Sequence, residues 1–243
     1  MQKIVAIIQA RLASTRLPNK VMLPLLGAPM LERMVERLQN CTSIADIVIA
    51  TARGCTPIVE LAYRLDVGFW EGSEEDVLGR VLEAARFYEA DVIVELTGDC
   101  PLIDPAMVDK VVADYLLGGA DFVTNQLPYT APRGMDVRVF ATDKLAELDR
   151  KTQEAADREH CSLYFWEHPL EYIVRNVSTG CKPFHKDYRL TVDTQEDYAL
   201  VCNIFEALYP IKPDFNLFDI LHYLDTHPEA AALNRHVKQK AVR

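Results

Sequence analysis

The chain has 243 residues, of which 49% are hydrophobic and 26% are charged, a composition that excludes extensive disorder. Its net charge of −10 argues against broad binding to nucleic acid or to an anionic membrane. No apolar run approaches the ~18 residues of a membrane span, and six scattered cysteines without a C-x-x-C pair are typical of a reduced, cytoplasmic protein.

Short apolar runs alternate with amphipathic stretches, which predicts an α/β fold with a mostly parallel mixed sheet and helices on both faces. The predicted strands are residues 4–8, 47–50, 67–70, 92–96, 122–124, 137–140, 172–177 and 189–192. The predicted helices are residues 29–38, 57–65, 74–88, 105–117, 142–150, 155–167, 195–208 and 217–226, with Ser73 expected to cap the third.

The alternation is regular up to about residue 125 and returns near residue 187. We therefore expect residues 1–243 to form one domain, with 125–186 as an elaboration for substrate binding and dimerisation. The aromatic cluster Tyr164, Phe165 and Trp166 suits a homodimer interface, and ordinary core packing is its alternative. The basic tail from Asn234 is expected to fray.

A polar loop at residues 9–20 follows the first predicted strand. It offers three cations and a hydroxyl, namely Arg11, Arg16, Lys20 and Ser14. Guanidinium groups match phosphate oxygens, and three cations offset much of the charge of a nucleoside triphosphate. A basic surface helix is the alternative, but Pro18 and the missing apolar stripe disfavour it. The loop is therefore expected to bind phosphate.

Two aspartates are candidate ligands for a divalent cation. Asp99 follows the strand at 92–96, where ligands of open α/β sheets gather, and Gly98 before it allows close backbone approach. Helix capping is the alternative for Asp99, but Asp104 fills that role for the next helix. Asp193 follows the strand at 189–192, and helix capping there is an equal alternative to metal binding. Asp197 is expected on the exposed helix face.

Further polar groups occur in the later half of the chain. Arg133 and Asp136 either grip a polar substrate or close a turn, and the residues alone do not separate these roles. His160, two residues after Arg158, is either a ligand contact or a packed or solvated side chain.

Together these motifs resemble the cytidylyltransferases that make CMP-activated acidic sugars. The loop matches the signature Arg-x-x-Ser-x-Arg-x-Pro-x-Lys at every position. Family-like stretches recur at residues 72–78, 97–101, 132–137, 158–160 and 190–193. The resemblance is strongest to the branch of spore coat polysaccharide protein F, a relative of 3-deoxy-manno-octulosonate (KDO) cytidylyltransferase.

The resemblance implies a Rossmann-like, GT-A-type nucleotidyltransferase that transfers CMP from CTP to a hydroxyl of an acidic, ulosonic-acid-like sugar. The reaction would release pyrophosphate, and it would serve surface polysaccharide biosynthesis. Implied nucleotide-binding residues are Arg11, Ser14, Arg16, Lys20, Thr51, Ser73 and Gly98. Implied catalytic residues are Arg16, Lys20 and Asp99, with Asp99 and Asp193 as Mg²⁺ ligands. Implied acceptor-binding residues are Arg133, Asp136, Arg158 and His160.

One residue departs from the family pattern, because Arg138 stands where an acidic residue often follows the Gly-x-Asp-Val run. Such a change indicates either a different acceptor or only an altered surface strand. Alternative functions are cytidylyl transfer to a non-sugar alcohol or phosphonate, and a GT-A-like glycosyltransferase. The latter usually has an Asp-x-Asp motif, which follows no predicted strand here. A catalytically silent nucleotide-binding protein is the non-enzyme alternative, and the full set of loop cations and carboxylates counts against it.

Overall fold

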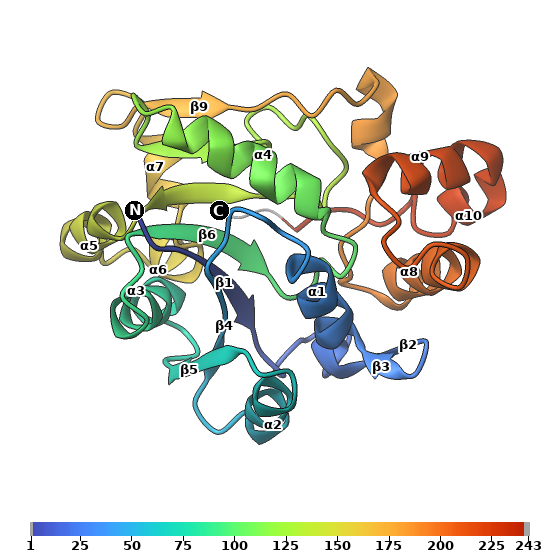
Figure 1. Cartoon of the computed structure of the whole chain (residues 1–243), viewed down its shortest axis with the longest axis horizontal. Coiled ribbons are helices and arrows are strands. Elements are labelled where there is room, and N and C mark those ends of the chain that lie inside the picture. The colour runs from blue at the N-terminus through green and yellow to red at the C-terminus, as the bar shows by residue number, and fades with distance from the viewer. Residues whose placement is uncertain (1, 241–243) are drawn as a thin grey trace.

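The computed structural model describes residues 2–240 and has a seven-stranded main sheet in the order β5-β4-β1-β6-β8-β7-β9 (Figure 1). The strands are β1 (Ile4–Ala10), β4 (Asp46–Ala52), β5 (Gly68–Gly72), β6 (Val92–Thr97), β7 (Phe122–Thr124), β8 (Arg138–Ala141) and β9 (Val174–Asn176). Only β8 runs antiparallel to its neighbours, β6 and β7, in this sheet. The prediction of a mostly parallel mixed sheet is confirmed.

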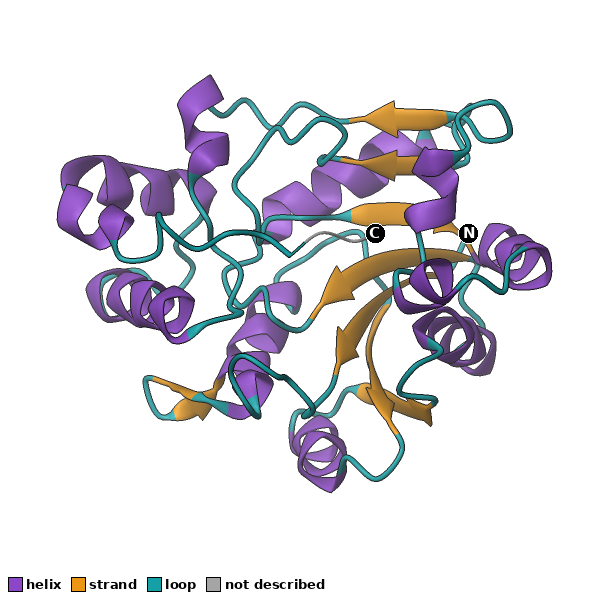
Figure 2. Cartoon of the chain, turned by 180° about the vertical axis from the view of Figure 1, so that it is seen from behind, coloured by secondary structure: helices purple, strands orange, loops and turns teal. Residues whose placement is uncertain are grey.

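Helices cover both faces of the twisted sheet (Figure 2). They are α1 (Met30–Leu38), α2 (Thr56–Arg64), α3 (Val77–Phe87), α4 (Pro105–Leu116), α5 (Thr142–Lys151), α6 (Ala155–Glu159), α7 (Leu163–Glu167), α8 (Gln195–Leu208), α9 (Leu217–Thr226) and α10 (Pro228–Ala232). A small hairpin, β2 (Pro24–Leu25) and β3 (Ala28–Pro29), precedes α1, and short 3-10 turns lie at Lys20–Met22 and Pro183–Asp187.

The central strand β1 is buried on both faces of the sheet, which explains its continuous run of apolar residues. Its side chains alternate between two buried cores, with Ile8 on one face of the sheet and Ile7 on the other. The first core is closed by α1, α2, α4, α8 and α9, and the second by α3, α5 and α7. A strand buried on both faces needs apolar residues at every position, as parallel sheets require.

The parallel strands β1, β4 and β6 bring their carboxyl ends to one edge of the sheet. The loop at residues 11–20, Thr51 on β4 and Asp99 after β6 therefore converge, although they are far apart in the sequence. This edge faces the group formed by α8, α9 and α10, as Figure 1 shows. The topology thus places the predicted phosphate loop and one predicted metal ligand together.

The predicted helix at 155–167 is in fact two short helices, α6 and α7, separated by residues 160–162. Cys161, Leu163 and Phe165 are all buried, at 0%, 2% and 0% exposure. These positions repeat every second residue, so a continuous helix would spread them around its circumference. The break allows Cys161 and Phe165 to enter the second core together, with Leu163 buried beside them in the sequence.

The predicted strand at 189–192 is extended but joins no strand ladder. Its backbone bonds go to loops instead, since Leu190 N–H donates to the Arg133 carbonyl at 2.7 Å and Val192 N–H to the Asp99 carbonyl at 2.8 Å. Gly134 makes this passage possible, because a Cβ there would lie 2.5 Å from the Leu190 carbonyl carbon. The predicted strand at 172–177 is likewise shorter, at Val174–Asn176.

The cap of α3 is Asp76 and not Ser73. Asp76 Oδ1 accepts the Gly79 N–H at 2.9 Å, whereas Ser73 Oγ accepts the N–H of Asp76 itself at 3.1 Å. A carboxylate suits this position because the amino end of a helix is partially positive. The serine closes the turn that leads into the helix.

Asp109 on α4 anchors the loop after α1. Its carboxylate accepts the backbone N–H and the hydroxyl of both Thr42 and Ser43, at 2.5 to 3.1 Å. Burial opposes its ionisation, but these hydrogen bonds outweigh burial and lower the pKa of Asp109. An amide at this position could not accept all of these donors.

Asp109→Asn is expected to lower the free energy of unfolding at pH 7 by about 1 kcal/mol. Because the folded-state pKa is lowered, the contribution of Asp109 is present above the unfolded-state value, near ~3.9, and disappears as pH falls through the folded value. Urea unfolding at several pH values measures the difference, which should shrink below about pH 4. The exposed Asp46→Asn serves as control; equal effects of both variants would contradict the anchoring role.

Among residues 2–240, no helix is both long and apolar enough to span a membrane.

Candidate functional site

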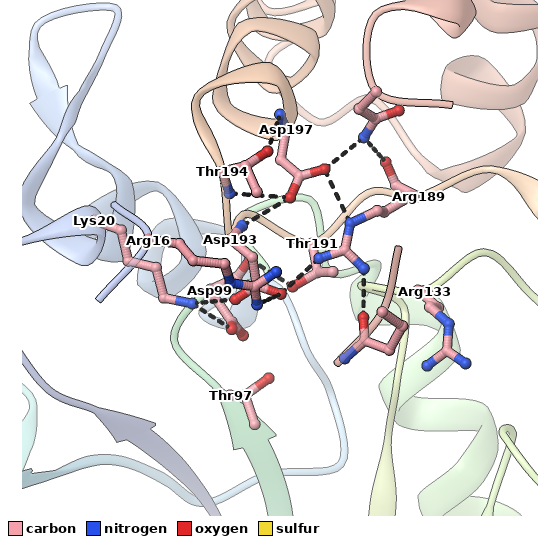
Figure 3. A network of polar contacts seen from close by, with 12 residues as sticks. Arg16, Lys20, Thr97, Asp99, Arg133, Arg189, Thr191, Asp193, Thr194 and Asp197 are labelled. Carbon is pink, nitrogen blue, oxygen red and sulfur yellow. Dashed lines mark hydrogen bonds and ion pairs between the residues drawn. The ribbon is translucent and has the colours of Figure 1, made fainter. Parts of the chain in front are cut away.

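Lys20 joins the two predicted metal ligands. Its Nζ lies 2.8 Å from Asp99 Oδ2 and 2.8 Å from Asp193 Oδ1 (Figure 3). The three side chains are 13% to 22% exposed, so the cluster is partly shielded from solvent. Lys20 and Asp193, which are 173 positions apart in the sequence, therefore form an ion pair in the fold.

The neighbouring charges favour the ionised forms of Lys20 and Asp193. Burial acts against the ammonium of Lys20, but Asp99 and Asp193 outweigh it and raise the pKa of Lys20. Burial likewise opposes ionisation of Asp193, and its cationic neighbours, Lys20, Arg16 and Arg189, hold the pKa of this carboxyl below its usual value. The carboxylate of Asp193 is thus available to a cation at neutral pH.

The rest of the phosphate loop surrounds this cluster. Arg16 is exposed and its Nη2 lies 3.1 Å from Asp193 Oδ2. Arg11 is exposed and meets Glu159 only at 3.5 Å, while Ser14 is half-buried. The loop is closed by a bond from the Asn19 N–H to the Leu12 carbonyl at 3.2 Å. Arg16 therefore lies beside the carboxylates, and both exposed arginines have donors left for an anionic ligand.

Asp193 is positioned by a buried polar network. Arg189 donates through Nη2 to Asp193 Oδ2 at 2.5 Å and through Nε to Asp197 Oδ1 at 2.9 Å (Figure 3). Asp197 Oδ2 also accepts the N–H of Asp193 at 2.9 Å. Asp197 is 0% exposed, so its predicted place on the exposed helix face is wrong. Its burial is tolerated because each oxygen has hydrogen-bond partners.

Thr194 caps α8 in a reciprocal capping box with Asp197, which settles the alternative left open for Asp193. Asp193 is free of the capping role and points at Lys20. Asn234 completes the network, donating to the Arg189 carbonyl at 2.9 Å and to Asp197 Oδ1 at 2.8 Å. Asn234 is buried, at 2% exposure, and Gln239 accepts a hydrogen bond from Arg189, so the expected fraying from Asn234 onward is wrong for these residues; residues 241–243 lie outside the described part.

The predicted nucleotide contacts lie beside the loop. Thr51 is 0% exposed and its Oγ1 has no hydrogen-bond partner among residues 2–240. Gly98 lies against β1, since its N–H donates to the Gln9 carbonyl at 2.8 Å and a Cβ would lie 3.1 Å from that oxygen. Ser73 accepts a short hydrogen bond from Arg80 at its carbonyl. Gly98 thus serves close packing of the strand ends.

Two of the predicted acceptor-binding residues lie on the β8 side of the edge. Arg133 stacks on Tyr129, with 4.2 Å from guanidinium carbon to ring centroid, and donates to its hydroxyl at 2.6 Å. Asp136 is shielded by protein, and this burial raises the pKa of its carboxyl despite Arg138 and Arg133 nearby. A rigid guanidinium and a carboxyl with raised pKa thus lie on one side of the site.

The other two predicted acceptor residues differ in their surroundings. Arg158 donates to both carboxylate oxygens of Asp76, at 2.8 and 2.5 Å, and to Asp149 at 2.9 Å. Its guanidinium is therefore committed to carboxylates of the protein, and it joins α6 to the start of α3. His160 ends α6 and is exposed.

The sequence reasoning missed a polar cluster inside the sheet, which we call the Glu95 cluster: Gln9, Glu95, Gln126 and Arg138. Arg138 lies opposite Glu95 in the β6–β8 register. Its Nη1 is 3.4 Å from Glu95 Oε1, and its Nη2 donates to Gln126 Oε1 at 3.2 Å. The available signal was a charged residue inside the apolar run 92–96, since buried charges need partners.

A divalent cation fits the point between Asp99 and Asp193, because the two carboxylates already hold the positive charge of Lys20 there. No cluster of three or more His, Cys, Asp or Glu side chains suited to a metal occurs within the described residues. Two carboxylates are the usual protein contribution where substrate phosphates and water complete the octahedral shell of Mg²⁺. The donor set therefore fits a nucleotide-bound Mg²⁺.

Comparisons with known proteins agree with this geometry. The spore coat polysaccharide biosynthesis protein SpsF of Bacillus subtilis is 32% identical over 95% of this chain and 98% of its own length. A 3-deoxy-manno-octulosonate cytidylyltransferase of Geobacter sulfurreducens is 36% identical over 97% of this chain and 85% of its own. The solved structure of a cytidylyltransferase from Leptospira borgpetersenii superposes with a TM-score of 0.90, at 31% identity, covering 99% of this chain and 100% of that one.

More distant structures share the fold alone. A CMP-KDO synthetase (CMP:2-keto-3-deoxy-manno-octonic acid synthetase) solved with CTP has a TM-score of 0.66 at 21% identity, over 84% of this chain and 98% of that one. A Mycobacterium tuberculosis protein solved with manganese has a TM-score of 0.58 at 18% identity, over 86% and 100%. The expected Rossmann-like nucleotidyltransferase fold is thus confirmed. The family model for cytidylyltransferases matches residues 5–222, and the chain belongs to that family of nucleotidyltransferases.

Proposed function

We propose that this cytidylyltransferase moves CMP from CTP to a hydroxyl of an acidic, ulosonic-acid-like sugar, with Mg²⁺ and release of pyrophosphate. The observation that carries the proposal is the convergence of Lys20 on Asp99 and Asp193 beside the exposed Arg16. Relatives named for spore coat polysaccharide synthesis and for KDO support a role in surface polysaccharide biosynthesis. The domain acts as one unit, with residues 125–186 on the acceptor side.

The chain's own residues bind and align the reactants. Arg11, Ser14 and Arg16 hold the triphosphate, and Arg16 and Lys20 offset the charge that develops on departing pyrophosphate. Asp99 and Asp193 would hold Mg²⁺, which would neutralise charge on phosphate oxygens and so favour attack at the α-phosphorus. Transfer of this kind depends mainly on positioning and on charge neutralisation.

The acceptor lies between the carboxylates and β8 in this proposal. Arg133 binds its acid group, because stacking on Tyr129 fixes the guanidinium while leaving donors free for an anion. Asp136 contacts the acceptor on the same side of the site. His160 contacts the acceptor, and Arg158 positions it by holding α6 against Asp76. Thr51 and Ser73 lie on the base and ribose side.

Pyrophosphate release from purified protein tests the proposal. Each of CTP, UTP, ATP and GTP is supplied with Mg²⁺ and with pooled acceptors: acidic sugars, polyol phosphates, phosphonates and other alcohols. Release that needs CTP, the metal and the acidic-sugar pool supports the proposal. Turnover with only a phosphonate or alcohol pool overturns the acceptor class, and CTP binding without turnover in any pool supports the silent-binder alternative.

We also propose a homodimer through the segment that contains β9. Phe165 stacks on Phe122 in the core, so it takes no part in such an interface. Leu170 and Ile173 are instead 101% and 63% exposed, next to the unpaired edge of β9. Exposed apolar side chains on a strand edge favour association.

Ile173→Glu is therefore expected to convert the dimer to a monomer, since it adds charge to the apolar face. Light scattering after gel filtration measures the mass, which is 27.5 kDa for one chain. Ile211→Glu, at another exposed apolar position, in the loop between α8 and α9, is the control. A monomeric parent protein, or a dimer that survives Ile173→Glu, would contradict the proposal.

A further inference from the structure

The two carboxylate oxygens of Glu95 differ in their hydrogen bonding. Its Oε1 accepts from Gln9 Nε2 at 2.9 Å and faces Arg138 Nη1 at 3.4 Å. Its Oε2 is buried and has no hydrogen-bond partner among residues 2–240, although the side chain is only 3% exposed. Leaving a buried charged oxygen without a donor is unfavourable, by about 1–3 kcal/mol or more.

The ion pair of Glu95 with Arg138 is poorly suited to a purely structural role. A structural arginine–carboxylate pair is usually bidentate, with two parallel N–H···O bonds. Here Arg138 turns only Nη1 toward Glu95 and gives Nη2 to Gln126 at 3.2 Å. Glu95 Oε2 is therefore left without a donor among residues 2–240. This arrangement suits a carboxylate that also accepts a hydrogen bond from a ligand.

The Glu95 cluster belongs to the acceptor side of the site. Glu95 shares its face of β6 with Thr97, two residues before Asp99, and Arg138 follows Asp136 by two residues on the neighbouring strand. Arg138 is 16% exposed at its side chain, so the cluster reaches the surface at this edge.

We propose that Glu95 Oε2 accepts a hydrogen bond from a hydroxyl or amino group of the acceptor and thereby selects and orients it. The inference rests on the proposed function and deepens it. Gln9 and Arg138 hold the carboxylate in place. Since Glu95 repels anions, the acid group of the acceptor lies away from it, toward Arg133. The acceptor class is therefore an acidic sugar with a donating group at the end remote from its carboxylate.

Steady-state kinetics of Glu95→Gln tests the inference, with the member of an acidic-sugar panel that the parent protein turns over best. The panel contains 3-deoxy-manno-octulosonate, a sialic acid and amino-sugar acids. The KM for that acceptor is expected to rise about 10-fold, the loss of one hydrogen bond to a charged group, while the KM for CTP stays unchanged. Glu32→Gln is the matched control, since it breaks the ion pair with Arg64 at 2.7 Å outside the site.

The neutral double variant Glu95→Gln with Arg138→Met provides a second measurement if the single variant folds poorly, because it leaves no unpaired buried charge. It is expected to show the same rise in acceptor KM with an unchanged Kd for CTP. If both variants keep the parent's acceptor KM, or change the CTP and acceptor constants equally, the inference is overturned and the proposed function stands. If the parent turns over no acidic sugar, both fail.

Discussion

Asp99→Asn is expected to slow CTP-dependent pyrophosphate release by about 10³-fold. The substitution keeps the shape of the side chain and removes one of the two negative charges that converge on Lys20. A loss of roughly 4 kcal/mol of transition-state stabilisation corresponds to this factor. Single-turnover assays with saturating Mg²⁺ and CTP measure the chemical step separately from binding.

Higher Mg²⁺ should restore little of that loss, because the missing ligand also fixes where the cation lies. Asp46→Asn is the control, since Asp46 pairs only with Lys3 at 2.8 Å at the opposite end of β4. An Asp99→Asn enzyme with nearly full turnover would remove Asp99 from the metal site.

Lys20→Met is expected to have two opposite effects. Turnover should fall about 10²-fold, because one donor to the departing pyrophosphate is lost. Affinity for a divalent cation without nucleotide should rise, because Lys20 competes for the same carboxylate oxygens at 2.8 Å. A residue that only stabilised the fold would not produce this combination.

Electron paramagnetic resonance of Mn²⁺ measures the second effect without any turnover. Lys3→Met is the control, because it removes a lysine that pairs with a carboxylate far from this edge. If Lys20→Met binds Mn²⁺ no more tightly than the parent protein, the two carboxylates are not the metal site. If binding tightens and turnover is unimpaired, the phosphate role of Lys20 is wrong.

The placement of the loop at residues 9–20 beside Asp99 could be predicted because the signals for both are local. Arg11, Arg16 and Lys20 lie within ten residues behind one buried strand, and the parallel topology brings that loop to Asp99. Alternating apolar runs likewise indicate both the strands and the faces of the sheet. Such patterns need no knowledge of distant partners.

The remaining site residues depend on partners far away in the sequence. The burial of Asp197 follows from Arg189 and Asn234, which no local pattern joins to it. Glu95 and Arg138 are 43 residues apart and become a pair only through the antiparallel insertion of β8. Helix periodicity predicts a solvent-exposed position for Asp197, because the pattern within one helix carries no information about Arg189 and Asn234, which cover it.

Asn234 has a consequence for the order in which the enzyme becomes complete. The phosphate loop and Asp99 come from the first half of the chain, whereas the alignment of Asp193 depends on an amide beyond α10. The position of the second carboxylate is therefore completed by one of the last segments of the described chain to be synthesised.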